Sequence, residues 1–233
     1  MLPIAILAGG LGTRLGKKTQ DIPKCLIEVQ GRPFVDWQLD LLINGGYQEI
    51  VFCVSHKSEL ILDYLRNHPR PSVNIGFSLD GELQLGTGGA IKNALNLLGP
   101  EFAVIYGDSY LPINFSEVEA TFRKNSALGL MTLYKNGDKL DLSNVIFENG
   151  KLVKYHKGLK DPRMKYIDYG VTYYRSEAFQ DYAENEKFDL SELGLRLSES
   201  KKLDGFEVDK RFYEIGSIQG IEDFSDYLVR RSE

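Results

Sequence analysis

The chain has 233 residues, of which 42% are hydrophobic and 26% charged, and its formal net charge is −5. This length and composition fit one globular α/β domain, and the acidic balance argues against a general nucleic-acid-binding protein, which would usually be basic. No apolar run approaches the roughly 18 residues of a membrane helix, and Met1 leads directly into the first predicted strand. We therefore expect a cytoplasmic protein that binds neither nucleic acid nor a membrane.

The first half of the sequence alternates predicted strands with predicted helices. Short apolar runs bounded by turn residues indicate strands, and apolar residues at three- and four-residue spacing indicate helices. A short extended piece is expected at residues 26–29. Strands are expected at 4–8, 49–54, 73–79 and 102–106, and helices at 34–43, 58–67 and 86–98. This alternation predicts βαβ units and a parallel sheet.

The second half predicts a mixture of strands and shorter helices. Ser116 followed by Glu119 indicates a capping box that opens a helix ending at Arg123, and Asn149-Gly150 indicates a hairpin between residues 145–147 and 152–155. Further strands are expected at 127–134, 166–174 and 212–215, and further helices near 176–183 and at 190–198 and 220–230. No linker or repeat interrupts the chain, so we expect a single domain over residues 1–233.

The two cysteines, Cys25 and Cys53, lie on either side of a predicted helix with no CxxC or Cys/His spacing. We therefore expect reduced thiols and neither a disulfide nor a cysteine metal site.

A glycine-rich turn follows the first predicted strand, at Gly9-Gly10-Leu11-Gly12-Thr13-Arg14. Its glycines let the backbone turn sharply and expose N–H groups to an anion, and Arg14 adds a fork suited to phosphate oxygens. Lys24 supplies a second cation behind Pro23. The stretch predicts a polyphosphate site, although its glycine spacing fits neither GxxxxGK[ST] nor GxGxxG.

Two further segments are expected at the same edge of the sheet, because ligands of open parallel sheets lie at the carboxyl ends of the strands. The first is the glycine-rich helix start at residues 86–90, which alone would read as a simple turn. The second is Asp108, which follows an apolar strand and Gly107. A carboxylate placed there suits Mg²⁺, which typically takes one or two protein carboxylates.

The whole string from Ala8 to Pro33 resembles the signature of the sugar-1-phosphate nucleotidyltransferases. This resemblance implies a Rossmann-like three-layer α/β/α sandwich with a mostly parallel central sheet and an added antiparallel hairpin region. It implies transfer of a nucleoside monophosphate from a nucleoside triphosphate to a sugar 1-phosphate, with Mg²⁺ as cofactor and pyrophosphate as the second product. Several members carry a left-handed β-helix domain, which is not expected here because the hexapeptide repeats are missing, and a homo-oligomer is compatible with the family.

The resemblance also implies roles for individual residues. Lys24 would hold the α-phosphate and the incoming phosphate, Arg14 the departing pyrophosphate, and Asp108 the metal, and these three are the expected catalytic residues. The expected nucleotide-binding residues are Leu7, Ala8, Gly9, Gly10, Leu11, Gly12, Thr13, Gly86, Thr87 and Gly88.

The second metal carboxylate departs from the family pattern. Members usually end with a string such as Asp-Ile-Gly-Thr, whose Asp completes the metal site, whereas this sequence has Glu214-Ile215-Gly216-Ser217. Glu214 keeps the charge and extends the reach by one methylene, so it is expected to join Asp108 as a metal ligand. A structural surface glutamate is the alternative.

The acceptor side departs further. Where the family often reads Glu-Lys-Pro and Asn-Ala-Gly-Ile-Tyr, this chain has residues 156–158, His-Lys-Gly, and 168–171, Asp-Tyr-Gly-Val. The expected substrate-binding residues are Asp108, Lys157, Asp168 and Gly170. Asp168 can only accept hydrogen bonds when ionised, so it should prefer hydroxyls or an amine on the substrate. His156 could contact the substrate or bond a neighbouring backbone group.

Within the family, residues 85–91, LGTGGAI, and Lys17 in place of a common Pro resemble the mannoheptose-1-phosphate guanylyltransferases most closely. Uridylyltransferases that act on hexose or N-acetylmuramate 1-phosphate remain alternatives, as does a cytidylyltransferase for a non-sugar phosphate such as phosphocholine. A catalytically silent homologue would have lost Arg14, Lys24 or Asp108, and the sequence keeps all three.

Overall fold

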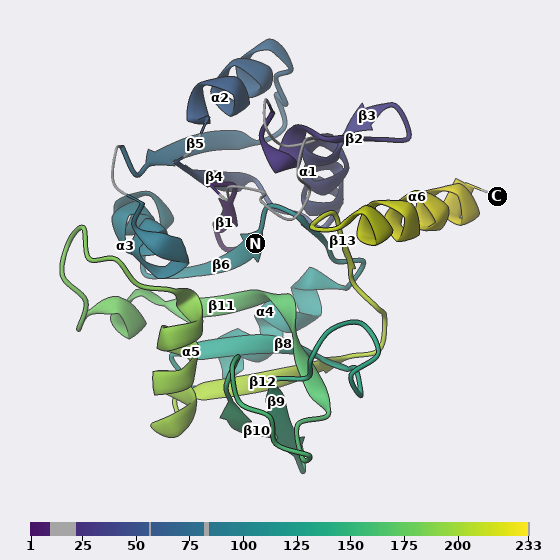
Figure 1. Ribbon diagram of the computed structural model, residues 1–233. Coiled ribbons are helices and arrows are strands. Elements are labelled where there is room, and N and C mark those ends of the chain that lie inside the picture. The colour runs from purple at the N-terminus through teal and green to yellow at the C-terminus, as the bar shows by residue number, and fades with distance from the viewer. Residues whose placement is uncertain (10–21, 56, 82–83, 233) are drawn as a thin grey trace.

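The structure is a computed structural model that describes residues 1–9, 22–55, 57–81 and 84–232 (Figure 1). The strands are β1 (Ile4–Leu7), β2 (Glu28–Val29), β3 (Arg32–Pro33), β4 (Glu49–Val54), β5 (Asn74–Leu79), β6 (Glu101–Tyr106), β7 (Ser109–Tyr110), β8 (Gly129–Lys135), β9 (Val145–Glu148), β10 (Lys151–Tyr155), β11 (Tyr166–Arg175), β12 (Leu203–Val208) and β13 (Tyr213–Glu214). The α-helices are α1 (Phe34–Asn44), α2 (Ser58–Asn67), α3 (Gly86–Leu98), α4 (Phe115–Lys124), α5 (Leu190–Glu199) and α6 (Ile218–Ser232), and the 3₁₀ helices are η2 (Lys24–Leu26) and η3 (Ser176–Phe179).

A large mixed sheet forms the centre of the molecule, with strand order β10-β9-β11-β6-β1-β4-β5. The strands β5, β4, β1 and β6 run parallel. They are short apolar runs because both faces of this part of the sheet are covered: Ile4, Ala5 and Ile6 of β1 are fully buried. The predicted parallel half is therefore confirmed.

The antiparallel part begins at β11, which runs against β6, β8 and β9. On its far side β8 pairs in parallel with β12, and β9 forms a hairpin with β10. The backbone at Asn149 and Gly150 has φ of 52° and 73°, as a two-residue hairpin turn requires, so the predicted hairpin is confirmed. A mostly parallel sheet with an antiparallel part was the expected architecture.

Helices cover both faces of the sheet (Figure 1). On one face, α1, α2 and α4 contribute Val35, Ile61 and Phe122 to a core with β1, β4 and β6. On the other face, α3 and α5 contribute Ile91 and Leu193, together with residues of η3. These three layers make the expected α/β/α sandwich.

A third, smaller cluster forms beside the sheet and involves the C-terminal helix. Phe224 of α6 packs against Phe34 and Tyr110 with ring centroids 5.4 and 4.8 Å apart, and Arg231 donates a 2.6 Å hydrogen bond to the Tyr110 hydroxyl. This cluster fixes the small β7–β13 ladder, which pairs Ser109 with Glu214. It thereby brings the end of the chain next to the turn after β6.

The predicted capping box at Ser116 and Glu119 is wrong. The helix after residue 114 begins at Phe115, so Ser116 lies inside it, and the Ser116 hydroxyl donates to Asn114 instead of capping. Glu119 is buried, and it accepts the Leu2 N–H at 2.8 Å and pairs with Arg123. The structure instead has a capping box at the start of α5, formed by Asp189 and Glu192.

Two elements differ from the expected pattern in smaller ways. Residues 24–26 form the 3₁₀ helix η2, so only the end of the expected extended piece at 26–29 is a strand. Strand β12 was not predicted, because Gly205 and two acidic residues break its apolar alternation. Among the described residues no helix combines the length and apolar character needed to cross a membrane.

Candidate active site

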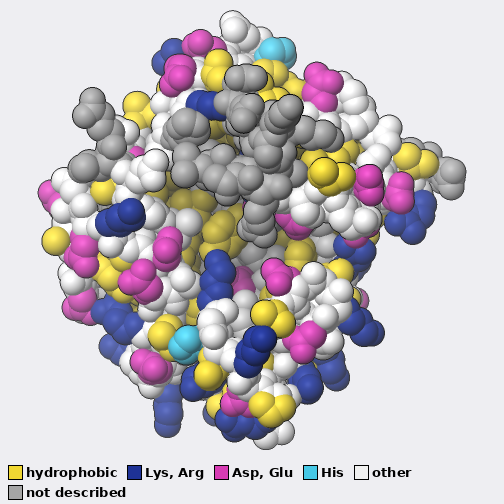
Figure 2. All heavy atoms as spheres, in the orientation of Figure 1, with side chains coloured by type: hydrophobic (Ala, Val, Ile, Leu, Met, Phe, Trp, Pro, Cys, Tyr) yellow, Lys and Arg dark blue, Asp and Glu magenta, His cyan; other side chains and the backbone are white. Residues whose placement is uncertain are grey.

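A cavity of about 280 Å³ opens at the carboxyl ends of β1, β4 and β6. Figure 2 shows this face of the molecule, with a hollow where hydrophobic, cationic and acidic side chains meet. Three segments expected to bind the nucleotide meet here: the end of β1, the start of α3 and the turn after β6. The lining residues that the sequence predicted are Leu7, Ala8, Gly9, Lys24, Gly86, Thr87 and Asp108.

Lys24 and Asp108 form an ion pair in this cavity. The Lys24 Nζ lies 2.9 Å from Asp108 Oδ2, and the side chains are 16% and 27% exposed. Lys24 opens η2, which the buried Cys25 anchors in the core. Burial raises the pKa of the Cys25 thiol to about 12, so this cysteine is a protonated packing group. An ammonium and a carboxylate held together at a cavity mouth suit a phosphate and a metal ion.

The turn that carries Asp108 is held tightly from two sides. A Cβ on Gly107 would lie 2.8 Å from the Leu7 carbonyl oxygen, and the Gly107 N–H donates to that oxygen at 3.0 Å. From the other side, the fully buried Gln38 of α1 donates its side-chain amide to the carbonyls of Tyr106 and Ser109, at 2.9 and 2.7 Å. Gln38 therefore clamps the backbone on both sides of Asp108.

The start of α3 forms another wall of the cavity and is tied to α5. The Thr87 backbone N–H and hydroxyl both donate to Asp189 Oδ1, and the Thr87 hydroxyl accepts the Leu190 N–H at 2.9 Å. Gly88 is buried against the ring of Phe188, where a Cβ would overlap ring atoms. Gly88 is not among the residues that line the cavity, so its contact with a nucleotide stays a prediction.

A second cavity, of about 360 Å³, adjoins the first and shares Tyr106 and Asp108 with it. It lies between the first half of β11, the β8–β9 loop and the β13–α6 turn. All four expected acceptor residues line it, together with Glu214: Asp108, Lys157, Asp168 and Gly170.

Asp168 enters this cavity at a β-bulge of β11. The register of β11 against β8 shifts between Asp168 and Thr172, and Gly170, at φ 113°, donates its N–H to Asp168 Oδ1 at 3.0 Å. Burial raises the pKa of Asp168 to about 6, although the Gly170 hydrogen bond and the charge of Lys157 both lower it. A carboxylate with one backbone partner is left able to accept from a ligand.

Asp108 and Glu214 come together through the β7–β13 ladder. The Ile215 N–H donates to the Asp108 carbonyl at 3.0 Å, and a methyl group placed on Gly216 would touch both carboxylates, lying 3.6 Å from Asp108 Oδ2. The Glu214 carboxylate accepts the Gly216 N–H and, at 3.0 Å, the Ser217 hydroxyl. Two carboxylates on the same turn supply the hard oxygen donors that Mg²⁺ takes in proteins. No larger group of His, Cys, Asp or Glu that could hold a metal occurs in the described part of the chain.

Some predicted residues lie elsewhere. The His156 ring nitrogen Nδ1 accepts the Gly158 N–H at 3.1 Å, and His156 does not line the second cavity. The backbone-bonding alternative for His156 thus accounts for its contacts. Outside the described residues lie the predicted Gly10, Leu11, Gly12, Thr13 and Arg14.

Comparison with known sequences identifies the family. A sequence model described as Nucleotidyl transferase matches residues 4–225. The chain belongs to this family.

Relatives of this nucleotidyl transferase span nearly its full length. A D-glycero-alpha-D-manno-heptose 1-phosphate guanylyltransferase of Campylobacter jejuni is 29% identical over 96% of this chain and 97% of its own. The bifunctional protein GlmU of Methanocaldococcus jannaschii is 26% identical over 96% of this chain, which spans 53% of that longer protein. The crystal structure of HddC from Yersinia pseudotuberculosis complexed with GMP-PN superposes with a TM-score of 0.80 at 25% identity and covers 98% of this chain.

Four residues of the nucleotidyl transferase site were missed by the sequence reasoning. Gln38 looked like a polar neighbour on a helix face, and only the folded turn shows what its amide holds. Tyr106 and Tyr155 fall inside predicted strands and were given no role, yet both line the second cavity. Asp80 lies just after β5 and lines the first cavity. The position of Asp80 directly after a predicted parallel strand could have indicated that it lines the site. No sequence pattern indicated this for Gln38, Tyr106 or Tyr155.

Proposed function

We propose that this nucleotidyl transferase transfers a guanylyl group from GTP to a mannoheptose-type sugar 1-phosphate. The observation that carries the proposal is the Lys24–Asp108 pair, 2.9 Å apart, at the junction of two adjoining cavities. One cavity suits a nucleotide and the other a phosphorylated acceptor, and the reacting groups would meet where the cavities share Asp108. The full-length similarity to a heptose 1-phosphate guanylyltransferase supports the choice of base and acceptor.

The chemistry is a displacement at phosphorus. An oxygen of the sugar phosphate bonds to the α-phosphorus, the bond from that phosphorus to the bridging oxygen breaks, and pyrophosphate leaves with the electron pair. Because the nucleophile is already an anion, no strong general base is required. The site has to neutralise charge and align the reactants, which is the main source of rate in phosphoryl transfer.

The residues divide this work. Lys24 would exchange its ion pair with Asp108 for the α-phosphate and incoming phosphate. Arg14 and the backbone of residues 9–13 are proposed to hold the pyrophosphate. Asp108 and Glu214 would hold Mg²⁺, which supplies charge neutralisation across the phosphates when bound. Lys157 would bind the sugar phosphate, and Asp168 would accept hydrogen bonds from sugar hydroxyls.

The test is pyrophosphate release measured over a matrix of four nucleoside triphosphates and several acceptors, each with Mg²⁺. The acceptors are mannoheptose, mannose, glucose and N-acetylmuramate 1-phosphates and phosphocholine. We expect turnover with GTP and a mannoheptose 1-phosphate above all other pairs. A clear preference for UTP with a hexose or N-acetylmuramate 1-phosphate, or for CTP with phosphocholine, would replace the proposal with that alternative.

A further inference from the structure

Strand β5 ends the parallel half of the large sheet, and only its inner edge is paired, with β4 (Figure 1). The Asn74 N–H donates at 2.7 Å to the carbonyl just before β4, and the Asp80 N–H donates at 3.1 Å to the last carbonyl of β4. Successive residues of a strand direct their N–H and C=O groups to opposite sides, so the even-numbered residues of β5 face β4. The backbone groups that point outward belong to the odd-numbered residues, Ile75, Phe77 and Leu79.

Most of these outward groups have no partner among the residues that the structure describes. Asn93 of α3 donates its side-chain amide to the Leu79 carbonyl at 3.2 Å. No other hydrogen bond reaches the outer side of β5 from the described part of the chain. The N–H and C=O groups of Ile75 and Phe77 and the N–H of Leu79 are thus available to another strand. A row of such groups is a template for pairing with a second chain.

The other two edge strands of the large sheet carry charges, whereas β5 does not. Strand β10 pairs only with β9 and contains two lysines, and β12 pairs only with β8 and contains two acidic residues. Charges on an edge strand discourage pairing with another chain, because pairing would take them out of water. Strand β5 reads Asn-Ile-Gly-Phe-Ser-Leu, with no charge and no proline, and its register with β4 has no bulge. The sheet is therefore open to another strand at β5.

The side chains beside this outer edge are uncharged. Leu79 is 50% exposed. Because Asn93 bonds Leu79, this face of α3 points toward the edge, and Leu97 lies on the same face one turn later, 53% exposed. Asn96 next to it is also exposed. A partner strand at β5 would thus cover exposed leucines without burying a charge.

We infer that the chain forms a two-fold symmetric dimer in which β5 pairs antiparallel with β5 of a second copy. The outward groups match themselves when Phe77 of one copy lies opposite Phe77 of the other. In that register Ile75 of each copy lies opposite Leu79 of the other, and every such pair can exchange both of its hydrogen bonds. A contact that uses the same surface on both copies closes at two subunits.

The dimer leaves both candidate active sites open. Because the two β5 strands run antiparallel, the parallel halves of the two copies point in opposite directions. Their carboxyl ends, where the cavities lie, are then on opposite edges of the joined sheet. The inference is therefore independent of the proposed function.

Light scattering during size-exclusion chromatography, over a series of chain concentrations, tests the dimer. The wild type should give twice the chain mass of 26.3 kDa. Leu79→Pro removes an outward N–H that the β4 ladder does not use, as an edge strand tolerates. It should weaken the dimer at least about 10-fold, because the hydrogen bond is lost in both copies and a carbonyl is left unpaired. Leu79→Ala keeps the N–H and is the matched control, which should remain a dimer.

Hydrogen exchange of the wild type locates the interface without any variant. The amides of Ile75, Phe77 and Leu79 should exchange more slowly as the chain concentration rises, because only the dimer bonds them. Those of β12 should not change. A monomer at every concentration overturns the inference, as does a dimer whose β5 amides gain no protection. A folded Leu79→Pro that dimerises as tightly as Leu79→Ala also overturns it.

Discussion

Asp108 lies at the centre of the site, and three neighbouring residues contact its turn in different ways. Lys24 balances its charge, Gln38 fixes its backbone, and Glu214 adds a second carboxylate through the β7–β13 ladder. Because these contacts use different atoms of the same turn, single substitutions should have different kinetic signatures. Three predictions follow at this scale.

Lys24→Met should lower kcat/KM by about 10²- to 10³-fold, since one positioned cation at a developing charge is typically worth ~3–4 kcal/mol of barrier. Steady-state pyrophosphate release with GTP and the preferred acceptor measures the effect. Lys151→Met, at the exposed start of β10, is the control and should stay near wild type. Wild-type turnover in Lys24→Met would exclude a catalytic role for this ammonium.

Gln38→Met keeps the side-chain volume but leaves the carbonyls of Tyr106 and Ser109 without a donor. We expect the free energy of unfolding to fall by about 2 kcal/mol, from the cost of unsatisfied buried groups. Because Gln38 positions Asp108 and does not touch substrate, kcat should fall about tenfold or more while the KM for GTP changes little. Urea denaturation and steady-state kinetics measure both, with the exposed Gln48→Leu as control. A stability loss with unchanged kcat would limit Gln38 to a structural role.

Asp168 should make stability fall as pH rises. Its pKa is raised from 3.8 to about 6 in the folded state, so the folded chain binds more protons than the unfolded chain between these values. The free energy of unfolding should therefore decrease from pH 4 to pH 6 and then level off. Asp168→Asn should remove part of this slope and gain on the order of 2 kcal/mol at pH 7. Urea denaturation from pH 4 to 8 tests this, with Asp63→Asn as the control that keeps the slope; an unchanged slope in Asp168→Asn contradicts the assignment.

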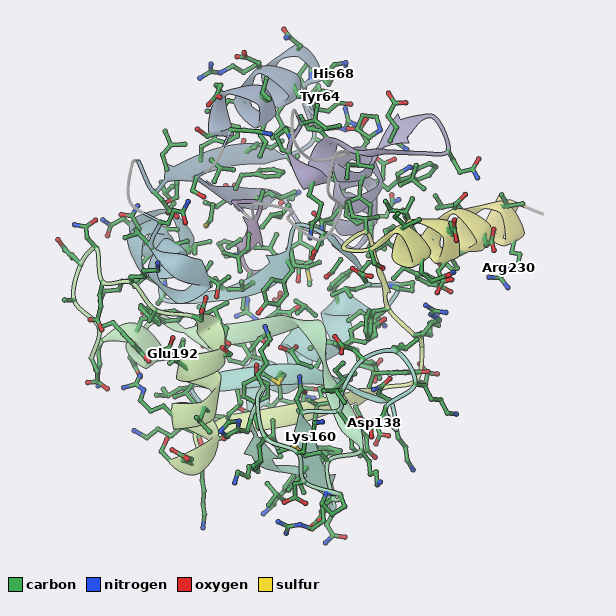
Figure 3. All side chains as sticks on the ribbon, in the orientation of Figure 1. Tyr64, His68, Asp138, Lys160, Glu192 and Arg230 are labelled. Atoms are coloured by element: carbon green, nitrogen blue, oxygen red, sulfur yellow. The ribbon has the colours of Figure 1, made fainter. Side chains whose placement is uncertain are left out.

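At the scale of elements, the wall that α3 gives to the first cavity depends on the N-cap residue of a different helix. Asp189 caps α5 together with Glu192, which Figure 3 shows at the start of that helix, and it also holds Thr87 of α3. The two helices lie on the same face of the sheet and share one apolar cluster. A change at the start of α5 should therefore reach the cavity.

Asp189→Ala removes the cap of α5 and both hydrogen bonds to Thr87. We expect a loss of about 1–2 kcal/mol in the free energy of unfolding, the upper range for a cap, together with weaker GDP binding. Thermal denaturation and calorimetry measure the two effects. Asn114 begins α4 without a side-chain capping bond, so Asn114→Ala should change stability by about 0.5 kcal/mol or less. Equal effects of both substitutions would contradict the coupling.

Elements differ in how far the sequence could predict them. The buried strands β1, β4 and β6 are continuous apolar runs, so their pattern is unambiguous. Strand β12 is an edge strand with Gly205 at its centre, where a Cβ would lie 2.6 Å from Leu133, and a glycine required by packing looks like a loop residue in the sequence. The capping box at Ser116 matched its motif, but the observed N-cap is Asn114, two residues earlier. The motif alone cannot decide between neighbouring helix starts.

At the scale of the whole molecule, the site lies where the parallel half of the sheet meets its antiparallel part, at β6 and β11. A residue that follows a parallel strand could be placed from topology alone, as Asp108 shows. Residues such as Tyr155 and Glu214 come from the antiparallel region and the end of the chain, whose return path no local pattern encodes. Asp168 was found through the resemblance, but its exposure to the cavity depends on a bulge that only the folded register reveals.

Binding of GDP and Mg²⁺ where the two cavities meet at Asp108 should stabilise the entire fold. With Mg²⁺ and GDP at 100 times the dissociation constant, the gain should be about 2.7 kcal/mol, which corresponds to roughly 5–10 °C in Tm for a chain of this size. Thermal denaturation with GDP should show this rise, and EDTA should reduce it. Asp108→Asn should respond to GDP but lose the EDTA effect. A GDP-dependent rise that EDTA leaves untouched would count against Mg²⁺ at this site.

The pairing of β7 with β13 has a consequence for synthesis on the ribosome. Residues 109–110 are translated about a hundred residues before their partner strand at residues 213–214 and the helix that packs on it, which come last. A nascent chain that ends before residue 213 therefore holds Asp108 while the carboxylate proposed to share a metal ion with it is still missing. We therefore expect activity only after β13 has paired with β7 and α6 has packed beside them.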